Sequence, residues 1–403
     1  MLRACAQTCL RLRQARCRVD GEAAGPAQGS VAPRSILIVG GGIAGMSAAI
    51  LLARSGARVD LIDLDAQWKV AGAGITITGP TLRAMQTLGI LDEIRALGYT
   101  GNGIRVCRTD GSVIAELATP APKGTDIEGS GGIMRPVLHR ILSQQVLARG
   151  TNVTLGVTVE SLRQDQNQVQ VQLSDGVQGS YDLVIGADGL HSRVRKLLLA
   201  DAPTPEYTGQ CIWRVAVPRP ADIDRRHFFL GGPVKVGLSP VSKDEMYLFL
   251  LETRSAPGWM TDERAHVELA QLLEGYGGVL RDIRSGLNGS ARIVFRPLEA
   301  FFLPAPWHRG NVVLIGDAAH PTSPQLASGA GMAIEDAIVL AEELQRAPGV
   351  AQACNAFMGR RYERCRLVVE NSLEIGRREQ RGDSVESQTT LVEQSLRALA
   401  EPI

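Results

Sequence analysis

The stretch that decides the fold is residues 36–45, which reads ILIVGGGIAG. Four apolar residues run into the spacing Gly40-x-Gly42-x-x-Gly45, and a helix-forming run at residues 46–53 follows directly. In this context Gly40 allows a tight turn, Gly42 lets the backbone approach a pyrophosphate, and Gly45 lets the helix pack against the strand. The free N–H groups at the start of the helix then face the phosphates. The stretch predicts a dinucleotide-binding unit.

A second strand is expected at residues 58–62, and it ends at Asp63, 18 residues beyond Gly45. A carboxylate at this place can accept hydrogen bonds from a ribose 2′-OH. The motif and the acid together predict a bound dinucleotide, but they leave NAD and FAD open.

The composition is that of an ordinary globular protein. Of 403 residues, 44% are hydrophobic, and 43 Lys and Arg stand against 42 Asp and Glu. This balance gives no net field that would attract nucleic acid or an anionic membrane. No apolar run approaches the roughly 18 residues of a membrane span. The seven cysteines are scattered without a CxxC pair, so reduced thiols in a cytoplasmic protein are expected.

The first 34 residues differ from the rest of the chain. Five arginines precede the first acid, Asp20, and a Gly/Ala/Pro-rich stretch follows. We interpret residues 1–34 as a disordered leader or an upstream start, with an organelle transit peptide as the alternative.

Hydrophobic periodicity suggests an α/β chain that changes character after residue 206. Before it, a helix is expected at 81–97, a hairpin at 104–117, a mobile glycine-rich loop at 124–132 and a helix at 135–147. After it, four close strand-like runs imply an antiparallel sheet, at 211–217, 226–230, 234–238 and 246–251. A helix at 262–276, strands at 292–297 and 312–315, and helices at 331–344, 351–369 and 385–399 complete the pattern.

Two further stretches repeat the logic of a strand that delivers a carboxylate at its C-terminal end, where open α/β sheets bind ligands. Residues 182–195 read DLVIGADGLHSRVR, with Asp188 after the strand. Residues 312–337 read VVLIGDAAHPTSPQLASGAGMAIEDA, with Asp317 after the strand and a glycine-rich helix start near Gly329. Asp317 can accept a hydrogen bond from a ribityl hydroxyl, and the helix start can face an electron-rich flavin edge.

In this order and spacing, GGGIAG, DGLHSRVR and GDAAHPTSP…GAGMAIEDA resemble the three fingerprints of the single-component FAD-dependent aromatic monooxygenases, the para-hydroxybenzoate and salicylate hydroxylase superfamily. The resemblance covers residues 35–370 and suits the short bacterial form. It implies a Rossmann-like FAD-binding domain at 35–105, 130–205 and 297–345. It also implies an inserted antiparallel substrate domain at 106–129 and 206–296, with C-terminal helices at 346–403.

The resemblance also assigns roles to single residues. The FAD pyrophosphate would lie against the glycine turn, the adenosine ribose against Asp63, and the ribityl chain against Asp317. Pro324 matches the proline beside the flavin edge where oxygen reacts, and Asp188 would help to bind both FAD and the nicotinamide donor. The full set expected to bind the cofactor is Gly40, Gly42, Ile43, Ala44, Gly45, Asp63, Lys69, Arg135, Asp188, Asp317, Gly331 and Met332, with no metal.

The implied reaction uses NADH or NADPH to reduce FAD, and O2 then forms a flavin C4a-hydroperoxide that hydroxylates a phenol, pyridine or quinolone-like ring. No second dinucleotide motif occurs, so the nicotinamide must dock transiently. Arg214 is the candidate cation that activates the substrate, with a structural salt bridge as its alternative. His320 is the candidate base, with a structural role as its alternative. His227 and Tyr247 could line the pocket, and the Glu335-Asp336 pair is expected to charge a helix face.

Two alternatives to the hydroxylase remain. A flavin halogenase shares the fold, but its catalytic lysine and its Trp-x-Trp-x-Ile-Pro stretch are missing. A non-catalytic FAD-bound redox sensor is kept open by Ala327-Ser328-Gly329, where the family usually has Gly-Gln-Gly. The sequence does not name the substrate, choose between NADH and NADPH, or fix the oligomeric state, and it leaves a homodimer open.

Overall fold

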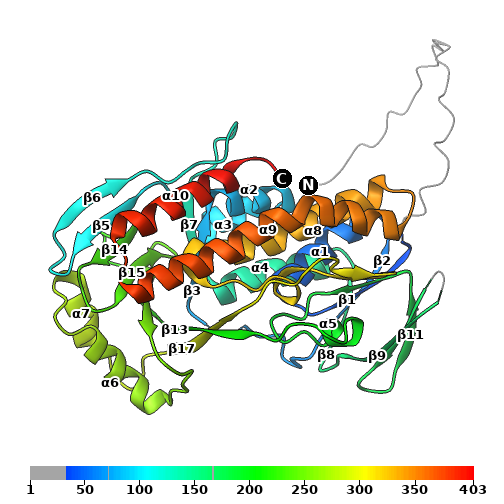
Figure 1. Cartoon of the computed structure of the whole chain (residues 1–403), viewed down its shortest axis with the longest axis horizontal. Helices are drawn as coiled ribbons and strands as arrows, with labels where there is room; N and C mark the ends of the chain where they lie inside the picture. Colours follow the sequence, from blue (N-terminus) through cyan, green and yellow to red (C-terminus); the bar gives the residue numbers. More distant parts are fainter. Residues whose placement is uncertain (1–32, 71, 166–167) are drawn as a thin grey trace, which may run out of the picture.

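The glycine-rich stretch begins a parallel sheet toward one end of the long axis of the molecule (Figure 1). The structure, a computed structural model, describes residues 33–70, 72–165 and 168–403, so the leader expected at 1–34 lies almost wholly outside the described residues. The six-stranded sheet has the order β18-β19-β12-β1-β2-β8, parallel except for β18. Its strands are β1 (Ser35–Val39), β2 (Arg58–Asp63), β8 (Asn152–Leu155), β12 (Leu183–Gly186), β18 (His308–Arg309) and β19 (Val312–Leu314).

Helices cover this sheet, and two small sheets flank it. Helix α1 packs against α8 and α4, and these helices bury the apolar strands in the larger of the two main cores. The helices near the sheet are α1 (Ile43–Ala53), α2 (Gly79–Leu88), α3 (Leu91–Leu97), α4 (Arg135–Ala148), α5 (Arg193–Leu198) and α8 (Gly329–Arg346). The small sheets are formed by β3 (Gly74–Thr78), β4 (Tyr99–Gly101) and β7 (Ser130–Met134), and by β9 (Val159–Gln164), β10 (Val169–Leu173) and β11 (Gln178–Tyr181).

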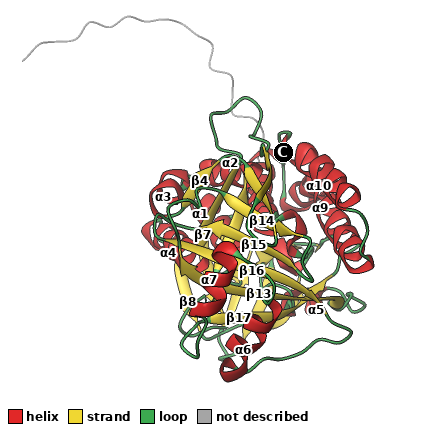
Figure 2. Cartoon of the chain, turned by 90° about the vertical axis from the view of Figure 1, so that its left-hand side faces the viewer, coloured by secondary structure: helices red, strands yellow, loops and turns green. Residues whose placement is uncertain are grey.

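A seven-stranded sheet lies at the other end of the long axis, with the order β17-β13-β16-β15-β14-β5-β6 (Figure 1). The predicted antiparallel sheet is confirmed, with one parallel pair where β5 joins β14. Its strands are β5 (Ile104–Arg108), β6 (Val113–Leu117), β13 (Glu206–Pro218), β14 (Arg226–Leu230), β15 (Lys235–Pro240), β16 (Glu245–Thr253) and β17 (Ile293–Ala300). Helices α6 (Asp262–Leu272) and α7 (Gly278–Gly286) cover its outer face (Figure 2). Their buried side chains belong to the same hydrophobic cluster as Trp213 and Phe229.

Two C-terminal helices, α9 (Val350–Arg381) and α10 (Val385–Ala400), pack against each other and complete the fold. At 32 residues, α9 runs for about 48 Å, and Figure 1 shows it along the length of the molecule, from the six-stranded sheet to the seven-stranded one. It contacts α8 near one end and β13 near the other. The expected domain limits stay a prediction. No described helix is long and apolar enough to cross a membrane.

One of the expected helices proves to be a pair of shorter helices, so the single helix predicted at 81–97 is wrong, whereas the helix predicted at 262–276 is confirmed as α6. Gly89 has a φ of +80° and ends α2, and α3 begins two residues later. A left-handed residue at the C-terminus is a common helix stop. Helix α6 ends at Leu272, four residues before the predicted end, and the separate helix α7 after the turn at Gly277 was not predicted.

The mobile loop expected at 124–132 is also wrong at its C-terminal end, because residues 130–134 form the buried central strand β7. A Cβ at Gly132 would meet the carbonyl oxygen of Pro240 at 2.2 Å, and one at Gly131 would meet that of Tyr99 at 2.8 Å. These glycines therefore serve close packing of strands, which a glycine-rich sequence does not distinguish from flexibility.

Candidate functional site

The glycine turn after β1 leaves room for a ligand at one place and excludes a side chain at two others. Gly40 has a φ of +107°, and a Cβ there would meet the Ala187 carbonyl oxygen at 2.3 Å. A Cβ at Gly45 would meet the Gly40 oxygen at 1.9 Å, whereas one at Gly42 would meet nothing within 4 Å. Helix α1 has no acid in its first turn and no side-chain cap within the described chain. Its first N–H groups are therefore free for a pyrophosphate, and the turn fits one.

A cavity of about 400 Å³ joins this turn to the seven-stranded sheet. One side is formed by α1, α4 and the loop that leads into α8, and the other by side chains of β13, β14, β15 and β16. Of the expected site residues, those that line the cavity are Gly42, Ile43, Ala44, Arg135, Arg214, Asp317 and Pro324. Those that do not are Gly40, Gly45, Asp63, Lys69, Asp188, His320, Gly331 and Met332.

Asp317 is the only acid in the described lining of the cavity. It lies deep in the molecule, yet its side chain is exposed because it opens into the cavity. Burial raises the pKa of this carboxyl, against the opposite influence of His320 and Arg135. A hydroxyl donor such as a ribityl group would satisfy a carboxylate in this position.

The free N–H groups at the start of α8 lie slightly earlier than expected. Gly329 and Ala330 line the cavity, whereas Met332 is 2% exposed and its N–H already donates to the Ser328 oxygen at 2.9 Å. A Cβ at Gly331 would meet Thr81 Oγ1 at 2.3 Å, so this glycine lets α8 pack against α2. The binding roles expected of Gly331 and Met332 stay predictions, and Gly329 and Ala330 are the residues of this helix start that line the cavity.

The carboxylate at the end of β2 holds the glycine turn in place. Asp63 Oδ2 accepts a hydrogen bond from Gly41 N at 2.6 Å, and Oδ1 accepts one from Asp65 N at 2.7 Å. Trp68, with a φ of +46°, donates from Nε1 to the Gly41 oxygen at 2.9 Å. The ribose contact expected of Asp63 stays a prediction.

Asp188 and Lys69 have local partners of their own. Asp188 accepts hydrogen bonds from the backbone N–H groups of Arg193 at 2.7 Å and Val194 at 3.0 Å, and so it caps α5. The exposed Lys69 donates to Gln67 Oε1 at 2.8 Å. Neither contact requires a cofactor, and the binding roles expected of both residues stay predictions.

Helix α4 brings the His139 imidazole to the cavity beside Arg135, and sequence reasoning missed this histidine. Arg135 and His139 stand four residues apart, on one face of the helix, and both line the cavity. His139 Nε2 is buried and has no hydrogen-bond partner among the described residues, and burial lowers the pKa of this imidazole. The sequence signal that could have identified His139 is its position four residues after Arg135, the arginine that the family resemblance assigned to FAD.

The loop that enters α8 presents Pro324 and Ala327 to the cavity. Ala327 has φ +50° and ψ +32°, the left-handed conformation. Glycine adopts it freely, whereas a residue with a Cβ is strained. The glycine that the family usually has at this position suits this left-handed backbone. Ala327 adopts the same conformation although it carries a Cβ.

The cavity face of the seven-stranded sheet follows the alternation of strand residues. On β13, Ile212 and Arg214 line the cavity, while Trp213 lies in the outer core. Tyr247 lines the cavity, as expected. His227 is 3% exposed, stacks on Phe229 and lies on the opposite face, so the expectation that it lines the pocket is wrong. Sequence reasoning missed the cavity side chains of Arg226 and Lys235.

Arg214 is a cation without a protein partner. No hydrogen bond or ion pair engages its guanidinium within the part of the chain that the structure describes. Burial, together with the neighbouring Arg135, lowers the pKa of Arg214 to about 10, and the side chain still carries its charge at neutral pH. The alternative of a structural salt bridge thus has no support among the described residues.

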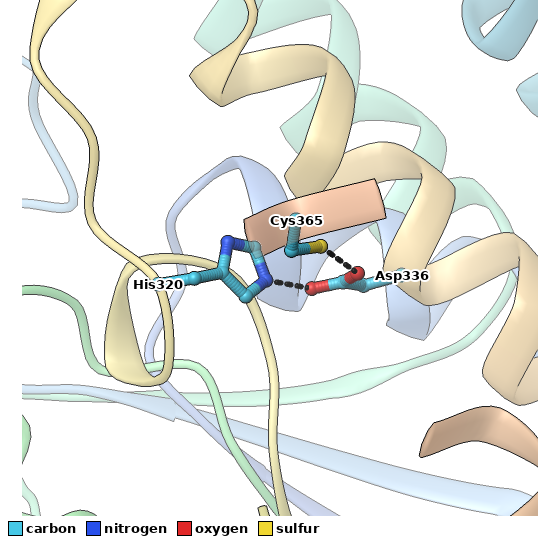
Figure 3. A group of neighbouring side chains, drawn as sticks. All are labelled: His320, Asp336 and Cys365. Carbon is cyan, nitrogen blue, oxygen red and sulfur yellow. Dashed lines mark hydrogen bonds and ion pairs between the residues drawn. The ribbon is translucent and has the colours of Figure 1, made fainter. Parts of the chain in front are cut away.

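His320 belongs to a buried ion network behind the cavity (Figure 3). Its Nε2 lies 2.6 Å from Asp336 Oδ2, and Cys365 Sγ lies 3.8 Å from Asp336 Oδ1. Burial opposes the charged imidazole, but the adjacent Cys365 and Asp336 raise the pKa of His320 well above its ordinary value. The three side chains could hold a metal ion by their spacing, yet the Arg361 guanidinium already occupies Asp336 Oδ1 at 2.8 Å. This geometry favours the structural role of His320 over the catalytic one.

The expectation that Glu335 and Asp336 charge a helix face is wrong. Glu335 is 1% exposed and Asp336 is fully buried. Glu335 accepts hydrogen bonds from Arg361 and Arg364, at 2.8 and 2.7 Å, so that α9 is clamped against α8. The partners follow more than 25 residues later, on a helix whose contacts the local sequence does not show.

Comparison with known proteins places this geometry in a family. The profile described as FAD binding domain matches residues 34–370. The chain belongs to this family of FAD-dependent monooxygenases. The 2-heptyl-3-hydroxy-4(1H)-quinolone synthase of Pseudomonas aeruginosa is 31% identical over 350 residues, with 85% of this chain and 89% of the relative covered. The 3-amino-4-hydroxybenzoate 2-monooxygenase of Streptomyces cremeus is 31% identical over 357 residues, with 86% of each covered.

A solved structure agrees in fold. Klebsiella pneumoniae HpxO complexed with FAD and uric acid superposes with a TM-score of 0.79 at 23% identity, covering 91% of this chain and 96% of that one. The monooxygenase family thus confirms FAD as the cofactor, NAD(P)H as the donor typical of the family, and an aromatic or heteroaromatic ring as the kind of substrate. The fold class expected from the sequence is confirmed as well.

Proposed function

We propose that this monooxygenase hydroxylates a phenol-like or hydroxypyridine-like ring, a class that extends to quinolones, and that Arg214 activates the ring hydroxyl. The observation that carries the proposal is the unpartnered Arg214 guanidinium on the cavity wall. A cation beside a hydroxyl lowers its pKa and favours the anion, which is the more reactive form of the ring. Pro324 and Asp317 lie on the other side of the same cavity.

The remaining wall suits a flat apolar ring. Phe228, Tyr247 and Phe249 present aromatic side chains, and the Phe249 ring lies over Gly237, where a Cβ would meet its Cζ at 2.2 Å. Tyr247 is fixed by a 2.6 Å hydrogen bond to Thr76. These rings orient the substrate by stacking and exclude water from the cavity.

Bound FAD supplies the activation of O2 after reduction by NADH or NADPH. In the overall reaction, one oxygen atom replaces a ring hydrogen as a hydroxyl, and the other leaves as water with the two electrons of the nicotinamide and two protons. The chain itself positions the ring and holds the charge of the substrate anion at Arg214. Asp317, Arg135 and the start of α1 would hold the cofactor in reach.

The test measures NAD(P)H oxidation by the purified holoenzyme with a panel of hydroxylated aromatics, pyridines and quinolones, with mass analysis for one added oxygen. We expect Arg214→Met to lower kcat/KM by roughly 10- to 100-fold, as for the loss of one charged hydrogen bond, while FAD content stays unchanged. The matched control is Arg296→Met, an exposed arginine on the neighbouring strand β17 that does not line the cavity.

The same assay separates the alternatives. Bound FAD that no nicotinamide reduces would support the non-catalytic sensor, and a halogenated product formed in the presence of halide would support the halogenase. Equal kinetics of Arg214→Met and the parent enzyme would remove Arg214 from the site.

A further inference from the structure

A second arginine on the cavity wall has no partner. Arg226 is 9% exposed, begins β14 and lines the cavity. Its Nε is buried without a hydrogen bond, and no other described residue forms a hydrogen bond or ion pair with its guanidinium. Its guanidinium lies over the face of Phe228, with Cζ 5.5 Å from the ring centroid. A buried cation without a counter-ion is costly, so the site is incomplete as the protein alone.

Acids are present nearby, but they are used by other arginines. Arg225 pairs with Asp224 at 2.9 Å and with Glu116 at 3.0 Å, and Arg105 pairs with Glu116 at 2.9 Å. The side chain of Arg226 lies on the cavity side, away from this exposed cluster. Burial lowers the pKa of Arg226, and the titratable groups that act on it are the phenols Tyr247 and Tyr99. A charge that the fold could have neutralised is thus kept for something that enters the cavity.

The strand register shows how the two free arginines relate. Arg214 pairs across the sheet with Phe249, Phe249 with Gly237, and Gly237 with Phe228. Arg226 stands in the next row, with Tyr247 two strands away in the same row. Three strand spacings separate β13 from β14, which is about 14 Å between backbones. Phe249 and Tyr247 stand on β16, between the two strands that carry the cations, an arrangement that fits a flat ring with an anionic group on each of two sides.

The names of the relatives do not decide whether the substrate of this chain carries a second anionic group. The name of the P. aeruginosa relative describes an alkylated quinolone without a carboxylate, whereas that of the S. cremeus relative describes a benzoate. Both are 31% identical to this chain. The choice therefore depends on the residues of the cavity.

We propose that Arg226 binds a carboxylate of the substrate, on the side of the ring away from the hydroxyl that Arg214 activates. The substrate is then a hydroxylated aromatic or heteroaromatic carboxylate, and a neutral alkylated quinolone is excluded. A guanidinium and a carboxylate match in geometry and form two parallel hydrogen bonds. This inference rests on the proposed function, since it names the substrate of the same site.

The test measures binding and turnover separately in the FAD-loaded enzyme. Binding is followed by the change in FAD absorbance on titration with 4-hydroxybenzoate and isomeric hydroxypyridine carboxylates, each against its neutral carboxamide and against 2-heptyl-4-quinolone. We expect a carboxylate to bind at least about tenfold more tightly than its amide. Arg226→Gln should abolish most of this preference, a reduction of about tenfold or more, and Arg226→Lys should restore part of it.

A second readout separates a binding role from a structural one. Without substrate, Arg226→Gln should leave the Tm of the holoenzyme unchanged or higher, because it removes a buried charge that has no partner. Arg225→Gln is the matched control. The charge of Arg225 is already paired with Glu116 and Asp224 at the surface, so its loss should not affect carboxylate binding.

Failure of the Arg226 inference and failure of the proposed hydroxylase function give different results in these measurements. If no aromatic stimulates NAD(P)H oxidation while carboxylates still bind through Arg226, the hydroxylase assignment fails and the anion site stands. Amides or the quinolone that bind as tightly as carboxylates would overturn the inference, as would a panel in which no carboxylate perturbs the flavin. A fall in Tm with unchanged carboxylate preference in Arg226→Gln would make this arginine structural and also overturn it.

Discussion

Two of the buried arginines among the described residues have opposite surroundings. Arg361, on α9, is 0% exposed and donates to Asp336 and Glu335, each at 2.8 Å, and to the Met332 oxygen at 3.3 Å. Arg226, on the cavity wall, is 9% exposed and has no such partner among the described residues. The pKa of Arg361 is raised by Asp336, Glu335 and Cys365 in spite of burial, whereas burial lowers that of Arg226.

The difference between Arg361 and Arg226 indicates a different role for each charge. A buried charge whose donors are all used holds helices together, and it is lost only with the packing that surrounds it. A buried charge without partners weakens the folded state, and under the proposal above a ligand would complete it. The region behind the cavity is therefore built for stability, and the cavity wall for binding.

The largest expected effect tests the paired side of this comparison. Arg361→Met should lower the free energy of unfolding by about 3–5 kcal/mol, because Asp336 and Glu335 stay buried without their shared cation. Thermal or denaturant unfolding of the holoenzyme measures the loss. The control is Arg366→Met, an exposed position of the same helix that pairs with Glu363 and Glu370, and it should change stability by less than about 0.5 kcal/mol. Equal Tm values for the two variants would contradict the stabilising role of the ion pairs of Arg361.

The sequence predicted local features of the site better than distant ones. The glycine turn at Gly40 and the acid Asp317 follow directly from a strand and a tight turn, so their placement needed no knowledge of the rest of the chain. Arg226 stands beside Arg225 and Asp224, and in sequence this looks like a surface charge cluster. Only the strand register turns one arginine to the acids and the other to the cavity.

The same limit explains the errors in the fold. Asp336 has the spacing of a helix residue and the charge of a surface one, and its partner Arg361 lies 25 residues later in the chain. The glycines of β7 have the composition of a loop, and only the neighbouring strands require them. Pairings between distant segments are set by tertiary packing, which local propensity does not contain.

The second prediction extends the comparison to an unpaired acid. Asp317→Asn should weaken FAD binding by roughly 10- to 100-fold, because a charged hydrogen bond to the cofactor is lost. The raised pKa of this carboxyl means that its ionised form destabilises the folded state above its ordinary pKa. The FAD-free variant should therefore have an unchanged or higher Tm at pH 7. Titration with FAD and melting of the apoprotein give the two values, and a variant that retains FAD fully during purification would contradict the role assigned to Asp317.

A smaller effect concerns the pH dependence of the paired region. His320 has a raised pKa, so its contribution to stability is complete below about pH 6.5 and is lost as the pH rises through the raised value. The pKa of Asp336 is about 2, although burial opposes ionisation, because His320 and Arg361 hold the carboxylate; its contribution is lost only in strong acid. His320→Gln should therefore lower stability by about 1–2 kcal/mol at pH 6 and by less at pH 9. Melting curves across this range measure the difference, and an equal loss at both pH values would mean that the charge of His320 is not involved.

The smallest effect tests whether the cavity face also carries backbone strain. Ala327 and Trp68 are the non-glycine residues with positive φ among those described, at +50° and +46°. Trp68 is held by its hydrogen bond to the Gly41 oxygen and by edge-on packing against His139, whereas Ala327 lines the cavity and has no polar side chain to hold its conformation. Ala327→Gly should remove a strain of about 1–2 kcal/mol and add about 0.4–1 kcal/mol of unfolded-state entropy, so the Tm should rise slightly. Ala330→Gly, in the first turn of α8, should lower it, since glycine is a poor helix former. If both variants melt lower than the parent, the left-handed turn is no source of strain, and the contrast between the two regions is confined to charge.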